Sequence, residues 1–186
     1  MTMTTTEQRP LILFAHGKES GPWGSKIRHL AEISQGLGAK VLSPDYSEIA
    51  SPDERVAYLL SLQLPPHSQL ILVGSSMGGY VSTVASAKLN PAGLFLMAPA
   101  FGLPGYAEQN PVPKAGAVCV VHGWRDEVVP AEHGIRFAAQ HHAELHVLDA
   151  DHRLNDVLPM LGLLFGQFLN YKPLARSVSN LSDQCE

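Results

Sequence analysis

The sequence lacks the features that mark several large functional classes. Acidic side chains outnumber basic ones, with a formal net charge of −4, so we expect no basic surface for nucleic acid or for an anionic membrane. No run approaches the roughly 18–20 apolar residues that a spanning helix needs. The first ten residues are polar and rich in threonine, without the apolar core of a secretion signal. These absences predict a cytoplasmic protein with neither nucleic-acid nor membrane partners.

Cysteine is also scarce. Cys119 lies in an apolar run and Cys185 near the end of the chain, so the two make no disulfide framework, which fits a reducing compartment. The nine histidines are more plentiful, but no set of Cys, His and Asp shows a convincing arrangement of metal ligands. We interpret His141, His142 and His146 as surface residues, and expect no metal or other cofactor.

Length and patterning predict one globular domain. The 186 residues, of which 45% are apolar and 16% charged, are enough for a sizeable core. We expect the domain to span residues 10–171, between a flexible arm at 1–9 and a flexible, serine-rich tail at 172–186. Short apolar runs alternate with segments of helical spacing. This alternation predicts an α/β fold, in which a mostly parallel six-stranded sheet lies between two layers of helices.

The expected elements follow from apolar runs, turn residues and capping residues. Strands are expected at 11–15, 39–42, 70–73, 93–98, 117–121 and 145–148. Helices are expected at 25–36, 52–64, 77–89 and 130–141, with a last one from about 155. Ser25, Ser51 and Asn155 are the candidate N-caps.

One stretch joins a strand, a sharp turn and a helix. The run from Leu70 to Val73 leads into Gly-Ser-Ser-Met-Gly at 74–78, which matches the G-x-S-x-G nucleophile elbow with Ser76 at its centre. Glycines fit there because the residues two before and two after the serine crowd together. Such a turn holds the serine in a strained conformation and lifts its hydroxyl above the sheet. A five-residue pattern also occurs by chance, and the flanking strand and helix are what favour the elbow. Ser75 lies one position early, without a glycine two residues before it.

Two other strand ends carry the groups that a serine nucleophile needs. A serine hydroxyl is weakly nucleophilic at neutral pH and requires a base, which an acid must orient. Asp126 follows the strand that ends near His122-Gly123, and His152 follows the last strand. In open α/β sheets, ligands bind outside the carboxyl ends of the strands. Asp126 and His152 are therefore the candidate acid and base, although either could be an ordinary surface residue. Three other acids compete for the role of Asp126: Glu127, Asp149 and Asp156.

In this order of Ser, Asp and His, the chain resembles the α/β-hydrolase family, and within it the small, capless serine esterases. The resemblance spans roughly residues 11–170 and rests on five segments: His16-Gly17, Pro44-Asp45, the elbow at 74–78, the His-Gly-x-x-Asp-x-x-Val-Pro segment at 122–130, and Asp151-His152. It implies Ser76 as nucleophile, His152 as general acid and base, and Asp126 as its partner in a catalytic triad. It also implies an oxyanion hole made by the backbone N–H groups of Met77 and Lys18.

The chain departs from the family pattern in three respects. It begins directly at the His-Gly strand, and it has no inserted cap domain, so only residues 100–116 could cover the site. Lys18-Glu19 places charges where the family often has an apolar residue. Phe101, Tyr106 and Trp124 are candidates for the substrate pocket, although they could equally pack over the edge of the sheet.

The expected function is hydrolysis of small carboxylic esters or thioesters through an acyl-enzyme, with a small-molecule ester as the substrate partner. A peptidase or amidase would use the same groups. The alternative is a non-catalytic binding or interaction protein on a hydrolase scaffold, because a fold does not fix a function. The sequence leaves open whether the chain forms a homodimer, and which acyl and leaving groups it accepts.

Overall fold

The computed structural model describes residues 8–171, in which strands and helices alternate. The strands are β1 (Leu11–Ala15), β2 (Lys40–Leu42), β3 (Leu70–Ser75), β4 (Gly93–Met97), β5 (Val118–Gly123) and β6 (Glu144–Leu148). The helices are α1 (Ser25–Gly36), α2 (Pro52–Ser61), α3 (Met77–Leu89), α4 (Ala131–His141), the short 3₁₀ helix η1 (Asn155–Val157) and α5 (Leu158–Tyr171). The expected tail at 172–186 and all but the last two residues of the expected arm at 1–9 lie outside the described residues.

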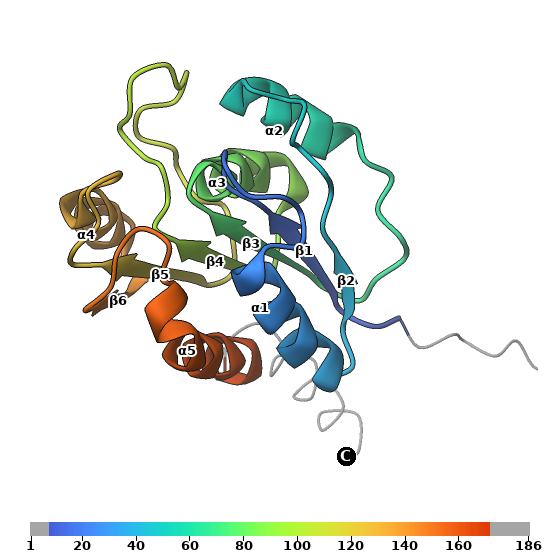
Figure 1. The fold of residues 1–186 in the computed structure, drawn as a ribbon. Helices are drawn as coiled ribbons and strands as arrows, with labels where there is room; N and C mark the ends of the chain where they lie inside the picture. Colours follow the sequence, from blue (N-terminus) through green and yellow to red (C-terminus); the bar gives the residue numbers. More distant parts are fainter. Residues whose placement is uncertain (1–7, 172–186) are drawn as a thin grey trace, which may run out of the picture.

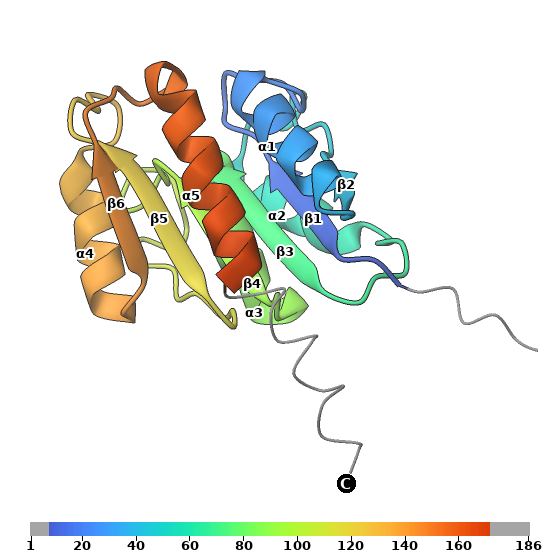
Figure 2. The same ribbon diagram turned by 90° about the horizontal axis from the view of Figure 1, so that it is seen from below.

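All six strands are parallel and lie in the order β2-β1-β3-β4-β5-β6 (Figure 1). Helices α1 and α5 cover one face of the sheet, and α2, α3 and α4 cover the other (Figures 1 and 2). The predicted three-layer α/β fold is confirmed, and the sheet is wholly parallel. Because the strands are parallel, the loops that follow β1, β3, β5 and β6 all leave from the same edge.

The core has two halves, one on each face of the sheet. Successive residues of β3 alternate between them: Ile71 and Val73 face α1 and α5, whereas Leu70 and Leu72 face α2 and α3. Strands buried on both faces read as continuous apolar runs, which is why these segments stand out in the sequence. Each fully buried Leu, Ile or Phe side chain contributes about 1.5–3 kcal/mol relative to an exposed one. The burial fixes the sheet as a rigid base for the loops at its carboxyl edge.

The last helix packs against the sheet through an apolar face. Leu161, Phe165 and Phe168 of α5 are buried, and the ring centroids of Phe165 and Phe168 lie 5.0 and 5.5 Å from that of Phe95 on β4. None of the helices in the described part of the chain is long and apolar enough to cross a membrane.

The structure confirms one predicted N-cap and corrects two. The Oγ of Ser51 accepts the N–H of the third residue of α2 at 3.3 Å. Ser25 is instead the first residue of α1, after Gly24 as N-cap, and its Oγ donates to Asn155 Oδ1 at 3.0 Å. Asn155 opens η1 rather than capping α5. The two polar side chains satisfy each other, and the bond ties the start of α1 to the loop after β6.

Several element boundaries also differ from the prediction; β3, for example, continues two residues past its expected end, to Ser75. Helix α2 ends at Ser61 rather than at 64, because Leu62 already has an extended backbone with ψ of 134°; Leu60 is exposed and Leu64 lies beyond the helix. Strand β5 continues two residues past the expected end, to Gly123, because its last residues pair with β6. Pairing with a neighbour therefore keeps the strand regular through residues that favour a turn.

Candidate active site

The turn between β3 and α3 has the strained geometry predicted for the elbow. Ser76 is the N-cap of α3, with φ of 53° and ψ of −118°, a region that a residue with a side chain rarely adopts. Its N–H donates to the carbonyl of Met97 at the end of β4, at 2.9 Å. The neighbouring strand therefore fixes the backbone of Ser76 in this conformation.

The glycines on either side of Ser76 are required by close backbone contacts. A Cβ on Gly74 would overlap the carbonyl of Gly78 and lie 2.6 Å from the Cα of Gly79. A Cβ on Gly78 would instead overlap the carbonyl of Ala15 at the end of β1. Gly74 is thus needed to close the elbow itself, whereas Gly78 is needed to pack α3 against β1, a contact that the local pattern did not predict.

Three side chains form a continuous line of hydrogen bonds at the carboxyl edge of the sheet. His152 Nε2 lies 3.0 Å from Ser76 Oγ, and His152 Nδ1 lies 2.7 Å from Asp126 Oδ2. An ionised carboxylate only accepts, so Nδ1 carries the proton and donates to Asp126. The bare Nε2 then faces the serine hydroxyl and can accept its proton. The loops after β3, β5 and β6 bring together the three residues that the sequence singled out.

Asp126 is buried and its carboxylate is held in the ionised form. Oδ1 accepts the backbone N–H groups of Val128 at 2.9 Å and Val129 at 2.8 Å. Burial acts to raise the pKa of Asp126, but hydrogen bonds from His122, His152 and the Val129 N–H outweigh it and hold the pKa well below the usual range. The competing acids are all exposed, and within residues 8–171 none forms a hydrogen bond or ion pair with His152: Glu127, Asp149 (paired with Arg125) and Asp156.

A second histidine contacts the same carboxylate from inside the fold. His122 is fully buried at the end of β5, and its Nε2 lies 3.1 Å from Asp126 Oδ2 and 2.8 Å from the carbonyl of Val129. Both neighbours accept, so Nε2 carries a proton that the two share. His122 therefore donates to Asp126. The four-residue spacing between His122 and Asp126 was the sequence feature that could have indicated this hydrogen bond.

Two backbone N–H groups lie beside Ser76. A Cβ built on Gly17 would be 3.4 Å from the Cβ of Ser76, so the loop after β1 passes next to the serine, and Lys18 follows at once. Met77 is the first residue of α3, where helix N–H groups have no partner within the helix. Within residues 8–171, neither the Lys18 nor the Met77 N–H donates to another backbone group. The role of the two as an oxyanion hole stays a prediction.

The three candidate pocket residues are not brought together. Phe101 is buried, with its ring centroid 4.4 Å from that of Phe137 on α4. Tyr106 packs edge-on against Tyr80 of α3, at 4.8 Å. Trp124 is 61% exposed, in the loop after β5. Phe101 and Tyr106 therefore extend the core over α3 and α4, and a contact of any of the three with substrate stays a prediction.

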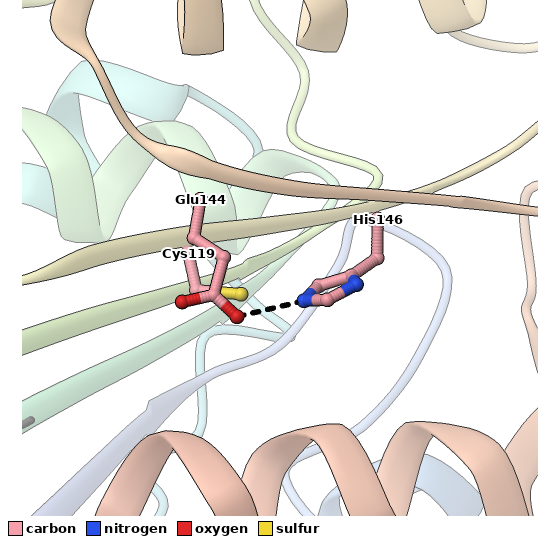
Figure 3. Close-up of side chains that lie close together, drawn as sticks. All are labelled: Cys119, Glu144 and His146. Carbon is pink, nitrogen blue, oxygen red and sulfur yellow. Dashed lines mark hydrogen bonds and ion pairs between the residues drawn. The ribbon is translucent and has the colours of Figure 1, made fainter. Parts of the chain in front are cut away.

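A cluster of potential metal ligands lies on β5 and β6 (Figure 3), where the sequence indicated none. One ligand atom each of Cys119, Glu144 and His146 lies within 4.8 Å of the others. The arrangement follows from strand register, because Cys119 pairs with Glu144 and His146 is two residues further along the same face. His146 is thus half-buried rather than a surface residue, and its Nε2 lies 2.8 Å from Glu144 Oε1. Cys119 and Glu144 each make a further interaction within the chain.

Two basic residues near the site were not predicted from the sequence. Lys26, in the first turn of α1, is half-buried; burial lowers its pKa to about 8, although the nearby carboxylates of Asp151 and Asp126 favour the charged form. Arg55 of α2 is 1% exposed. Its position offered a signal, because Arg55 falls on the buried side of α2 together with Val56 and Leu59.

No protein-family model and no curated protein sequence matches the chain. Several solved structures do. A protein from Xanthomonas campestris assigned to the α/β superfamily of hydrolases is 29% identical, with a TM-score of 0.77, over 88% of this chain and 99% of that one. A serine hydrolase without a lid, also from Xanthomonas campestris, is 20% identical, with a TM-score of 0.67, over 92% of this chain and 86% of that one.

A protein from Butyrivibrio proteoclasticus called Est1E is 18% identical to this chain, with a TM-score of 0.74, over 89% of this chain and 88% of that one. At such identity the likeness to Est1E and to the lidless hydrolase shows the fold. The described residues insert no further domain between the strands of the sheet. By its sheet, its elbow and these structural neighbours, the chain is a member of the α/β-hydrolase superfamily, with the fold in a minimal form.

Proposed function

We propose that the protein is a serine hydrolase that cleaves small carboxylic esters or thioesters. The observation that carries the proposal is the line of hydrogen bonds from Ser76 Oγ through His152 to Asp126, with spacings of 3.0 and 2.7 Å. A structural serine does not need a base, and a base does not need a buried, ionised carboxylate behind it. The three groups together are what acyl transfer to a serine requires.

The reaction follows from the positions of the protons. Ser76 Oγ attacks the carbonyl carbon of the ester while its proton passes to His152 Nε2, and Asp126 stabilises the imidazolium that forms. The backbone N–H groups of Met77 and Lys18 donate to the negative oxygen of the tetrahedral intermediate. The intermediate collapses, and the leaving alkoxide or thiolate takes the proton from Nε2. Water then gives a proton to Nε2 and attacks the acyl carbon. As this second intermediate collapses, Ser76 Oγ takes the proton back from Nε2, and the carboxylic acid is released.

The structural neighbours support an ester as substrate. One structure of Est1E contains bound ferulic acid, an aromatic carboxylic acid, and another neighbour is an esterase from Pyrococcus furiosus. A thioester would use the same groups and a better leaving group. The assay therefore includes both an ester and a thioester.

The proposal is tested by comparing two adjacent serines. Purified wild-type protein, Ser76→Ala and Ser75→Ala are assayed with p-nitrophenyl acetate and with a short acyl thioester, and each is treated with a fluorophosphonate probe. We expect Ser76→Ala to lose several orders of magnitude in turnover, as in comparable triads, and to take up no probe. Ser75→Ala should keep much of the activity, because Ser75 is buried at the end of β3 and makes no hydrogen bond to His152.

Full activity in Ser76→Ala would contradict the assignment of the nucleophile. A folded wild-type protein that neither reacts with the probe nor turns over any ester, thioester or amide would instead support the binding-protein alternative.

A further inference from the structure

Arg55 is a buried cation without a carboxylate partner among the described residues. It is 1% exposed and takes part in none of the ion pairs of residues 8–171. Its donors go to backbone carbonyls: Nε to Ile49 at 2.7 Å, and Nη1 to His16 at 3.3 Å and Gly17 at 3.2 Å. An arginine keeps its charge in a protein, and a buried charge is costly unless it is well paired. The fold therefore accepts a cost to place this charge against the loop that follows β1.

The carbonyl of Gly17 has a second donor, His16. The N–H of Tyr46 donates to His16 Nε2 at 2.9 Å, so Nε2 is unprotonated and the ring proton is on Nδ1. Nδ1 lies 2.7 Å from the Gly17 carbonyl and donates to it. Burial lowers the pKa of His16, although the bond to Gly17 acts to raise it, so the neutral ring is favoured. Two donors from separate elements thus fix one carbonyl oxygen.

Fixing that oxygen also fixes the N–H of Lys18, because both belong to the same peptide group. The described residues contain no cis peptide bond, and in a trans peptide the C=O and N–H point in opposite directions. With the oxygen turned toward Arg55 and His16, the Lys18 N–H points away from them. Gly17 lies next to the serine, since a Cβ on Gly17 would be 3.4 Å from the Cβ of Ser76.

We propose that Arg55 is a positioning residue for acyl transfer: together with His16 it orients the peptide between Gly17 and Lys18 so that the Lys18 N–H donates to the oxyanion. The inference rests on the proposed serine-hydrolase function. The guanidinium also polarises the Gly17 carbonyl, which makes the N–H of the same peptide a stronger donor. An oxyanion exists only after attack on the carbonyl. Loss of Arg55 should therefore lower kcat and leave KM nearly unchanged.

The test uses two substitutions of Arg55 and a matched control. Arg55→Met removes the charge and the donors but keeps the length, whereas Arg55→Lys keeps the charge and loses the planar fork. Lys40→Met is the control, because Lys40 Nζ also donates to a carbonyl, that of Pro66, at the opposite edge of the sheet. The measurements are kcat and KM for p-nitrophenyl acetate, and the inhibition constant of a trifluoromethyl ketone, which forms a tetrahedral adduct with a nucleophilic serine.

We expect Arg55→Met to lower kcat about 10²–10³-fold, the usual loss for one oxyanion donor, and to weaken the ketone by a similar factor. Arg55→Lys should lose about tenfold in both, and Lys40→Met should match the wild type. In ¹⁵N-labelled protein, the Lys18 amide resonance should move in Arg55→Met and stay in place in Lys40→Met. That signal reports on the peptide without any turnover.

The outcomes separate this inference from the proposed function. Wild-type kcat and ketone affinity in folded Arg55→Met, with an unmoved Lys18 resonance, overturn the positioning role and leave the serine hydrolase intact. If Arg55→Met does not fold, wild-type kcat and ketone affinity in Arg55→Lys overturn it in the same way. A wild-type protein without turnover dependent on Ser76 removes the proposed function, and this inference with it.

Discussion

Two histidines share one oxygen of Asp126 and differ in what their second nitrogen meets. His152 faces the Ser76 hydroxyl with Nε2, whereas the Nδ1 of His122 is buried without a partner in the described residues. His152 can therefore take and release a proton at the open side of the site. His122 can only donate to Asp126 from inside the fold, and this hydrogen bond helps to keep the carboxylate ionised and in place.

The first prediction concerns the pH dependence of turnover. His152 must be neutral to accept the serine proton, and histidine is the side chain that ordinarily gains its proton between pH 5 and 8. The pKa of Asp126 is lowered in the fold, so this carboxylate stays ionised above its unfolded value and takes up a proton only as the pH falls further. We therefore expect kcat/KM for p-nitrophenyl acetate to fall with acidification, because a protonated His152 cannot accept the serine proton.

The control for this pH profile is Ser75→Ala, which should show the same decline. A rate that is flat from pH 5 to 8 would remove His152 as the base. EDTA should leave the rate unchanged, because the proposed mechanism uses no metal ion. Loss of activity with EDTA that zinc restores would instead point to the cluster at Cys119, Glu144 and His146.

At the scale of elements, one helix supports the site from behind. Gly134 of α4 packs against His122, and a Cβ at Gly134 would lie 2.5 Å from His122 Nδ1 and 3.4 Å from its Cε1. Because His122 is fully buried, its ring has little room to move away. Helix α4 can therefore approach the end of β5 only with a glycine at this position.

The second prediction is that Gly134→Ala disturbs the site through His122. We expect overpacking to cost about 1–3 kcal/mol of unfolding free energy, and kcat to fall because the displaced ring loses its bond to Asp126. The matched control is Gly36→Ala at the end of α1, where a Cβ meets nothing within 4 Å and helix propensity favours alanine by up to about 1 kcal/mol. Urea unfolding and kcat are measured for both variants. Unchanged kcat in Gly134→Ala would show that His122 is not needed to hold Asp126.

Element ends that are fixed by residues close in sequence were predicted correctly, whereas ends that are fixed by residues far apart in sequence were not. The start of α2 was predicted because Ser51 caps its own helix, and the limits of α3 because Ser76 and Asn90 end it locally. The end of α2 is set by the extended backbone at Leu62, and the end of β5 by pairing with β6. The local spacing of apolar residues encodes neither. The cluster on β5 and β6 was missed for the same reason.

In the candidate site, too, some residues could be predicted from local sequence and others could not. Ser76, Asp126 and His152 lie in recognisable segments at strand ends, so their meeting could be predicted once a parallel sheet was inferred. The carbonyl contacts of Arg55 could not, because they join α2 to a loop 38 residues earlier in the chain. An arginine on an otherwise apolar face was the one visible sign, and it does not identify the partner.

At the scale of the whole molecule, little of residues 8–171 is available to enclose a substrate. The described residues place no domain over the carboxyl edge of the sheet, and the segment between β4 and β5 is fixed at its middle. Tyr80 donates to Asp53 Oδ1 at 2.6 Å, and the N–H of Ala107 donates to Asp53 Oδ2 at 3.3 Å. Phe101 and Tyr106 of this segment are used in core packing.

The third prediction is a preference for short acyl groups. Each methylene adds about 0.8 kcal/mol only where the protein covers it, so the gain should stop after a few carbons. The measurement is kcat/KM across p-nitrophenyl esters from about two to sixteen carbons, with Ser76→Ala as the blank for background hydrolysis. A profile that still rises at about twelve carbons would mean that a tunnel exists among residues assigned here to the core.

The order of the strands also bears on how the protein is made. Ser76 and His152 are 76 residues apart, and the histidine follows β6, the last strand to leave the ribosome. Synthesis proceeds from the N-terminus at about 5–20 residues per second, so the elbow emerges seconds before its base. Without that base Ser76 is a plain alcohol with little reactivity. If the protein is the proposed serine hydrolase, Ser76 therefore stays an unreactive hydroxyl in the nascent chain until the final strand joins the sheet.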